Sequence, residues 1–204
     1  LIPGARAMLG VRMPALRKIA KELMRGDWRG FLALYTEDVY ELTLLRALVI
    51  ASAPCQTDER LNLLKEFIPS IDNWAVCDAI CGSLRVPAKE RGHVTEFVEP
   101  YSFSKSEFEV RFAAVMLLSH FVTEADIDRT LSLYAAMSHE GYYAQMAIAW
   151  GISVCFVKFR NQTLALLEEG TLEKFIQNKS IQKIRESYRV CGADKELLQT
   201  LLKK

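Results

Sequence analysis

Apolar residues recur at helical spacing along almost the whole chain, and this pattern constrains the fold more than any other feature. One such stripe comprises Leu16, Ile19, Ala20 and Leu23, and comparable stripes continue to the C-terminus. Residues three or four positions apart share one face of an α-helix. There is no alternating run bounded by a hairpin turn, as a strand pair would require. The sequence therefore predicts an all-α fold.

Prolines, glycines and polar turns divide the chain into about a dozen predicted helices of ~10–17 residues. Breaks are predicted at Gly26-Asp27, Pro54, Pro69, Pro87, Pro100, His139–Gly141, Gly170 and Gly192. The long apolar helices are predicted to begin near residues 39, 72, 105, 141 and 178. This step of ~33–37 residues is the period of paired-helix repeats. We therefore expect an α-α superhelix whose concave face is lined by the second helix of each pair.

Length and composition indicate a compact protein. The chain has 204 residues, half of them hydrophobic, which is enough for a sizeable core and too apolar for disorder. No apolar run reaches the ~18–20 residues of a membrane span, and no signal peptide is visible. The five cysteines sit mostly in apolar runs, which is typical of reduced thiols in the cytoplasm. We expect a cytoplasmic monomer. The chain begins with Leu1 and not with methionine, so the sequence leaves open whether N-terminal residues are missing.

Cys77 and Cys81 are four residues apart, a spacing that brings a metal pair to mind. However, no histidine or second cysteine pair follows at zinc spacing, and His93, His120 and His139 are scattered. We therefore predict no metal site and no cofactor.

The net charge of +1 conceals an uneven distribution. Residues 1–30 carry seven Lys/Arg and two Asp/Glu, and residues 173–204 carry eight and four. The middle of the chain has a net charge of −8. Basic ends of this kind could bind phosphates. On charge alone, an ordinary solvated helix surface explains them equally well.

Trp74 and Asp78 are the most informative pair of residues. A spacing of four places the indole and the carboxylate on one helix face, one turn apart. Apolar residues surround them, and a carboxylate in such a setting needs a partner or a task because burying a lone charge is costly. Arg111 follows Asp78 by 33 residues, and Trp150 follows Arg111 by 39. One acid, one base and two indoles at roughly one-repeat intervals predict a single lined groove.

Each of these residues also has a structural explanation. Trp74 and Trp150 could be core aromatics, and Asp78 could hydrogen-bond to a neighbouring helix end. Arg111 could form a structural ion pair with Asp78. Trp28 is predicted to be a packing residue only.

The segment Gly10–Ala20 (GVRMPALRKIA) is followed at repeat spacing by Asn73-Trp74 with Asp78, by Val110–Ala113 and by Ala147–Trp150. In this order they are similar to the N-terminal signature and the three site segments of the AlkD-like DNA alkylation repair proteins. Ser180–Ser187 resembles the C-terminal repeat of that family. The resemblance covers essentially the whole chain, and four motifs in order are more specific than any one of them.

The resemblance implies a single HEAT-like repeat domain, residues 1–204, that cradles damaged duplex DNA. It implies a DNA glycosylase that removes positively charged N3- and N7-alkylpurines. Asp78 would be the catalytic carboxylate, Trp74 and Trp150 would contact the deoxyribose, and Arg111 would hold a nearby phosphate. A cationic base is already a good leaving group, and the oxocarbenium sugar that develops needs a negative charge nearby.

The basic ends supply the predicted contacts to DNA phosphates. The candidates are Arg12, Arg17, Lys179, Lys183 and Arg185. Two other functions stay open. One is a DNA-structure binder without excision, because Asn73 stands where active relatives often have a second tryptophan. The other is a protein-binding helical scaffold, for which a nearly neutral net charge is no obstacle.

Overall fold

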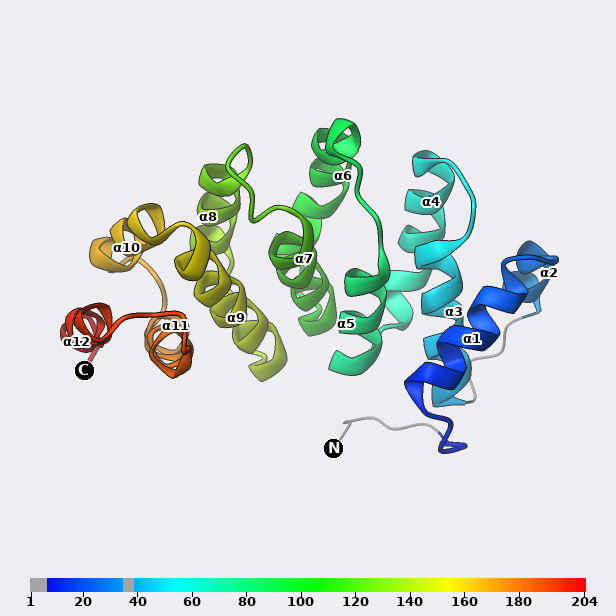
Figure 1. Ribbon diagram of the computed structural model, residues 1–204, viewed down its shortest axis with the longest axis horizontal. Helices are drawn as coiled ribbons and strands as arrows, with labels where there is room; N and C mark the ends of the chain where they lie inside the picture. Colours follow the sequence, from blue (N-terminus) through cyan, green and yellow to red (C-terminus); the bar gives the residue numbers. More distant parts are fainter. Residues whose placement is uncertain (1–6, 35–38) are drawn as a thin grey trace. The chain divides into compact units, whose positions relative to one another are not determined.

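A computed structural model of the chain describes residues 7–34 and 39–204, which form twelve α-helices, three short 3-10 helices and no strand (Figure 1). The prediction of an all-α fold is therefore confirmed. The α-helices are α1 (Met13–Leu23), α2 (Trp28–Ala33), α3 (Tyr40–Ser52), α4 (Thr57–Phe67), α5 (Trp74–Ser83), α6 (Arg91–Val98), α7 (Glu107–His120), α8 (Ile127–Ala136), α9 (Tyr142–Lys158), α10 (Arg160–Glu169), α11 (Lys174–Glu186) and α12 (Gly192–Thr200). The 3-10 helices are η1 (Ile68–Ser70), η2 (Ala88–Glu90) and η3 (Glu99–Phe103).

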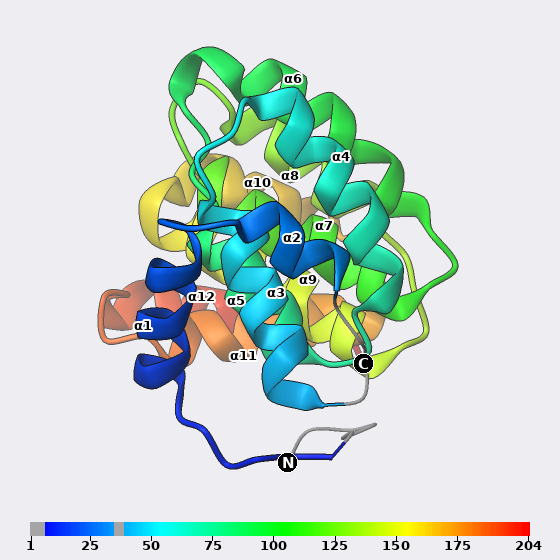
Figure 2. The ribbon, with the colours of Figure 1, turned by 90° about the vertical axis from the view of Figure 1, so that its right-hand side faces the viewer.

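The chain divides into two compact units, of which the first ends at Phe97 and the second spans Val98–Lys204. In the first unit, α1, α3 and α5 lie side by side, and α4 packs against α3 (Figures 1 and 2). Ten of the thirteen residues of α3 are buried, so this helix forms the centre of the unit. A single domain over residues 1–204 stays a prediction.

The carboxylate of Glu41, at the start of α3, holds the segment that leads into α1. The backbone N–H groups of Leu9, Gly10 and Val11 donate to it at 2.9, 2.7 and 3.2 Å. Gly10 has a φ of +77°, a conformation that favours glycine. Glu41 is 3% exposed, and this burial alone would raise its pKa, but the backbone donors outweigh burial and hold the pKa below its usual value. The start of the Gly10–Ala20 signature is therefore a carboxylate-binding turn.

In the second unit, α7, α9 and α11 lie side by side, and α8 and α10 pack against α9 (Figure 1). The closest approach is at Gly151 of α9, where a Cβ atom would lie 2.1 Å from the hydroxyl oxygen of Tyr134 on α8. That hydroxyl donates to the carbonyl oxygen of Ala114 on α7 at 2.8 Å. The glycine thus lets one tyrosine join three helices, which fixes the helix that carries Trp150.

The repeat pattern predicted from the sequence is present. The helices α3, α5, α7, α9 and α11 begin at steps of 32 to 35 residues. Four of these starts lie within two residues of the predicted ones, and α11 begins four residues earlier than predicted. Pro69 and Pro100 each lie in a 3-10 helix that directly follows an α-helix, so they end α4 and α6 as expected. The pairing of helices agrees with the HEAT-like fold.

Two local predictions are wrong, whereas the break at Gly192 is confirmed: α11 ends at Glu186, and α12 begins at Gly192. The helices α2, α6 and α12 have 6, 8 and 9 residues, shorter than the expected range. In the stripe of α1, Leu16 and Ala20 are buried but Ile19 is 41% exposed, because α3 is the one described helix that packs closely against α1.

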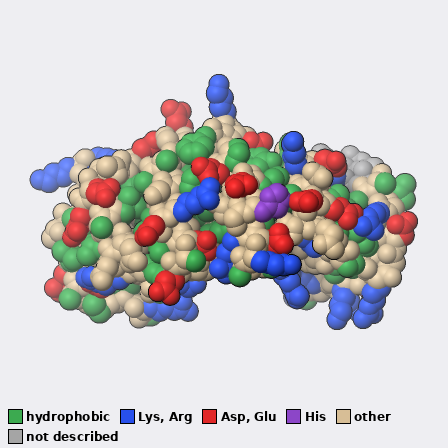
Figure 3. Space-filling model, turned by 90° about the horizontal axis from the view of Figure 1, so that it is seen from above, with side chains coloured by type: hydrophobic (Ala, Val, Ile, Leu, Met, Phe, Trp, Pro, Cys, Tyr) green, Lys and Arg blue, Asp and Glu red, His purple; other side chains and the backbone are tan. Residues whose placement is uncertain are grey.

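The outer surface has the mixed charge of a solvated helical protein. In both units, the face seen in Figure 3 carries acidic and basic side chains close together. Exposed ion pairs such as Arg29–Glu59 at 2.8 Å and Arg129–Glu99 at 2.5 Å each contribute about 1 kcal/mol or less. No helix within residues 7–34 and 39–204 has the length and hydropathy to cross a membrane.

Candidate functional site

Trp74 begins α5, and Asp78 lies one turn further along the same helix. Trp74 is 38% exposed and Asp78 is half-buried. Between them, Val76 and Cys77 turn into the core and are fully buried. The indole and the carboxylate therefore share the accessible side of α5, whereas the rest of the helix anchors it in the first unit.

Asn73 starts this helix. It is 3% exposed, and its side-chain oxygen accepts a hydrogen bond from the N–H of Val76 at 3.0 Å. Its amide nitrogen donates to the carboxylate of Asp72 at 2.7 Å. This is an N-cap, which satisfies one of the unpaired N–H groups at a helix start. Asn73 thus has a structural role in this chain.

Two predicted phosphate contacts of the first unit are exposed on α1 or at its start. Arg12 is the N-cap residue of α1. Arg17 lies one and a half turns further on, and its Nη1 donates to the hydroxyl oxygen of Ser83 at 3.3 Å. Because Ser83 is the last residue of α5, the Arg17 guanidinium lies beside the helix that carries Trp74 and Asp78.

Arg111, on α7, is mostly buried, with 6% of its surface exposed. Its Nη1 donates to the carbonyl oxygen of Tyr143 in the first turn of α9 at 2.9 Å. One turn earlier, Glu107 accepts a hydrogen bond from the N–H of Tyr143 at 2.5 Å. Glu107 and Arg111 together hold both main-chain groups of one residue, so Arg111 helps to position α9.

Trp150 lies in the middle of α9 and is 38% exposed, although the three residues before it are fully buried. Its carbonyl oxygen accepts a hydrogen bond from the hydroxyl of Ser153 at 2.7 Å. Trp28, by contrast, is 4% exposed and packs in the first unit, as predicted. The two tryptophans assigned to the site are therefore the two that solvent reaches, which argues against the core-aromatic explanation.

The basic candidates on α11 do not share one face. Lys179 and Lys183 are one turn apart, and Lys179 donates to the side-chain oxygen of Gln182 at 2.7 Å. The ammonium of Lys179 also lies 5.8 Å from the ring centre of Phe175. Arg185 is exposed, but two residues of helix rotate it by about 200° from Lys183. Lys183 and Arg185 therefore reach different surroundings.

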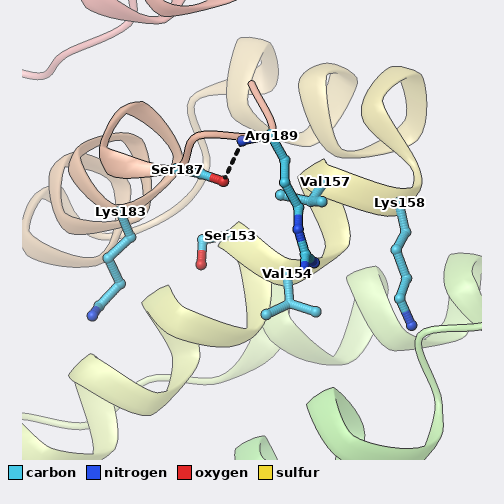
Figure 4. Close-up of a pocket in the computed structure, with 7 residues that line it drawn as sticks. All are labelled: Ser153, Val154, Val157, Lys158, Lys183, Ser187 and Arg189. Atoms are coloured by element: carbon cyan, nitrogen blue, oxygen red, sulfur yellow. Dashed lines mark hydrogen bonds between the residues drawn. The ribbon is translucent and has the colours of Figure 1, made fainter. Parts of the chain in front are cut away.

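A pocket lies between α9 and the end of α11 (Figure 4). Two of the cationic side chains that line it, Lys158 and Arg189, were not predicted from the sequence. The pocket has a volume of about 180 Å³ and is lined by Ser153, Val154, Val157, Lys158, Lys183, Ser187 and Arg189. No periodicity links Lys158 or Arg189 to Lys183, because they come from the end of one helix and from the turn after another. The only signal in the sequence was the basic character of the C-terminal segment.

The cysteines offer no nucleophile next to Trp150. Cys77, Cys81 and Cys155 are buried, and all five cysteines are free thiols. Burial raises the pKa of the Cys155 thiol to about 12, so it stays protonated at neutral pH. Cys77, Cys81 and Cys155 act as small core residues.

Each unit therefore contributes a distinct set of side chains. The first contains the pair Trp74 and Asp78 beside a basic helix. The second contains Trp150, the buried Arg111 and the basic pocket. A single groove that joins the two sets stays a prediction.

No curated protein and no solved structure matches the chain. The model of the family described as DNA alkylation repair enzyme matches residues 2–157. The match includes Trp74, Asp78, Arg111 and Trp150 and ends within α9, so the basic residues of α11 lie outside it. The matched range covers more than half of the 204 residues, and the paired helices agree with the fold that the resemblance implies. The chain belongs to the DNA alkylation repair enzyme family.

Proposed function

We propose that this protein is a DNA glycosylase that hydrolyses the N-glycosidic bond of positively charged N3- and N7-alkylpurines in duplex DNA. The observation that carries the proposal is the accessible indole–carboxylate pair, Trp74 and Asp78, on α5 of a chain that belongs to a DNA alkylation repair family. A buried pair would have favoured a purely structural role.

The chemistry requires little from an acid. When the N-glycosidic bond breaks, its electron pair moves to the base and neutralises the positive charge of the alkylated ring. The deoxyribose becomes an oxocarbenium ion, and water then adds to C1′ and loses a proton. Asp78 stabilises the sugar cation and orients the water. A half-buried carboxylate suits this role, because partial removal from water strengthens its electrostatic effect.

The indoles and the arginine would position the substrate. The faces of Trp74 and Trp150 favour a cation, and each is accessible enough to contact a deoxyribose. Arg111, whose Nη1 donates to the carbonyl oxygen of Tyr143, brings a positive charge to the second unit beside α9. The proposal assigns a DNA phosphate to this guanidinium as well.

A second candidate is a binder of DNA structures that performs no excision. The observation that favours it is Asn73, which caps α5 at the place where active relatives often have a second indole. A site with one indole on this helix would hold the sugar less firmly.

The deciding experiment is incubation of the protein with a duplex that contains one 7-methylguanine, followed by detection of the released base and of abasic sites. The unmodified duplex is the control. Release from the alkylated duplex alone is the expected result. Binding without release would overturn the glycosylase in favour of the DNA-structure binder. Absence of binding even at low salt would favour a protein-binding scaffold.

A further inference from the structure

The pocket between α9 and the end of α11 is a concentrated positive site. Three of its seven lining residues are cationic, namely Lys158, Lys183 and Arg189, and none is acidic. In Figure 4, Arg189 reaches past Val157, with Lys183 on one side and Lys158 on the other, and all three extend in the same general direction. Like charges held around one hollow repel one another, which an anion in the hollow would relieve.

The cations of the pocket are poorly neutralised within the protein. Across residues 7–34 and 39–204, the side chains of Lys183 and Arg189 form no hydrogen bond or ion pair. Lys158 makes only a long contact, 3.5 Å, to the carbonyl oxygen of Val122. Arg160, two residues beyond Lys158, is different: its guanidinium pairs with Asp194 at 2.5 Å. The structure thus neutralises a neighbouring arginine but not the cations of the pocket.

One hydroxyl group of the pocket is also available as a donor. The oxygen of Ser187 accepts a hydrogen bond from the N–H of Arg189 at 3.2 Å, which leaves its O–H free to donate. The hydroxyl of Ser153 already donates to the carbonyl oxygen of Trp150 at 2.7 Å. Cations and a hydroxyl donor around a small hollow suit a phosphate, whose oxygens only accept.

The pocket lies on the same side of α9 as Trp150. Val154 and Val157 line it, and they follow Trp150 at the i+4 and i+7 positions, which share a helix face. At 1.5 Å per residue, seven residues cover about 10 Å, or about three nucleotides of a DNA strand at 3.4 Å each. A strand whose sugar contacts Trp150 would thus bring a phosphate within reach of the pocket.

We propose that this pocket binds a backbone phosphate of DNA, with Lys183 and Arg189 as the principal ligands and Lys158 at its edge. The proposal rests on the proposed function only in requiring that DNA contacts Trp150. It extends the DNA contacts into the part of the chain that lies beyond the family match, residues 2–157. It also separates Lys183 from Lys179 and Arg185, which lie outside the pocket.

The test is equilibrium binding of the full chain to a short duplex over a series of salt concentrations. Each phosphate contact contributes about 0.9 to the slope of log affinity against log salt. Lys183→Ala and Arg189→Ala should therefore each lower the slope, and the double variant, which removes both principal ligands of this one phosphate, should lower it by about 0.9. Lys174→Ala is the matched control, because nine residues place Lys174 on the opposite face of α11 from Lys183. It should leave the slope unchanged.

Two further measurements keep the outcomes separate. Thermal melts should show no loss of stability in either pocket variant, since each removes one of three like charges. Duplexes with and without 5′-phosphates should give the same loss of slope; a loss confined to phosphorylated ends would overturn the backbone assignment. A double variant with the same salt slope as Lys174→Ala would overturn the assignment of the pocket as a phosphate site.

The result is also distinguishable from failure of the glycosylase. Base release by the parent protein together with unchanged slopes in the pocket variants would overturn the pocket alone. Lowered slopes without base release would support the pocket and overturn the glycosylase alone.

Discussion

The two units each present one tryptophan to solvent, but the residues one turn beyond it have different chemistry. In the first unit, Trp74 is followed at i+4 by Asp78. In the second, Trp150 is followed at i+4 by Val154, which forms a wall of the basic pocket. A carboxylate stabilises a cationic sugar but repels phosphate, whereas ammonium and guanidinium groups do the reverse. If the proposed function is right, the first unit therefore supplies the catalytic carboxylate, and the second supplies many of the contacts to DNA phosphates.

The largest expected effect is at Asp78. Asp78→Asn keeps the shape of the side chain but removes its charge, so the rate of base release should fall by about 10²-fold or more while DNA affinity stays nearly unchanged. Single-turnover release from the 7-methylguanine duplex measures the rate, and equilibrium binding measures the affinity. Asp128→Asn, an exposed residue of α8, is the control. An equal loss in both variants would contradict a special role for Asp78.

Arg111→Ala tests whether the second unit serves only in DNA binding, because Arg111 both positions α9 and belongs to the candidate site. Loss of the bond to the carbonyl oxygen of Tyr143 leaves a part-buried acceptor without this donor, at a cost of about 1–3 kcal/mol. The melting temperature, the DNA affinity and the rate of release should all fall. Arg111→Lys retains the charge, so it should recover affinity more than stability. An unchanged melting temperature in Arg111→Ala would show that the hydrogen bond to Tyr143 does not stabilise the fold.

Glu41 tests the attachment of α1 in the first unit. The folded state lowers the pKa of this carboxyl, so its stabilising contribution is complete above the pKa of the unfolded chain. It is lost as pH falls through the lower folded-state pKa. Glu41→Gln should lower the free energy of unfolding at neutral pH by on the order of 1–2 kcal/mol, since hydrogen bonds to a charged acceptor are lost. Urea melts from neutral to acid pH should show the gap closing.

Glu22→Gln is the matched control for this measurement, because Glu22 is exposed on α1. It should leave the unfolding curve nearly unchanged at each pH. A gap between Glu41→Gln and the parent that stays constant down to acid pH would contradict the assignment, since it would not depend on ionisation of the carboxyl.

The sequence predicted the helices well because their signals are local. The apolar stripes and the step of the repeat located α5 and α9, and the spacing of Trp74 and Asp78 placed both on one face. Exposure was harder to predict. Trp150 stands between Ala149 and Gly151 in a helix that is apolar almost all round, so periodicity could not show which side faces solvent.

The buried contacts and the pocket depend on tertiary structure. The burial of Arg111 results from the packing of α9 against α7, where the carbonyl oxygen of Tyr143 is placed to accept. The position of Arg189 depends on the turn after α11 bringing that residue back over α9. Neither arrangement follows from spacing along the chain, so the sequence could identify a basic C-terminal segment but not its pocket.

The smallest expected effect is at Arg17, and it tests how the DNA contacts are divided between the two units. Arg17→Ala should lower the salt slope by about one unit, which corresponds to a roughly fourfold smaller change in affinity between 50 and 200 mM salt. Ser83→Ala is the control, because it removes the 3.3 Å hydrogen bond to Arg17 without changing the charge. If Arg17→Ala lowers the slope and Ser83→Ala does not, DNA contacts the first unit as well. If Arg17→Ala binds like the parent while Lys183→Ala does not, the phosphate contact predicted for Arg17 is wrong. The second unit would then provide a larger share of the DNA contacts.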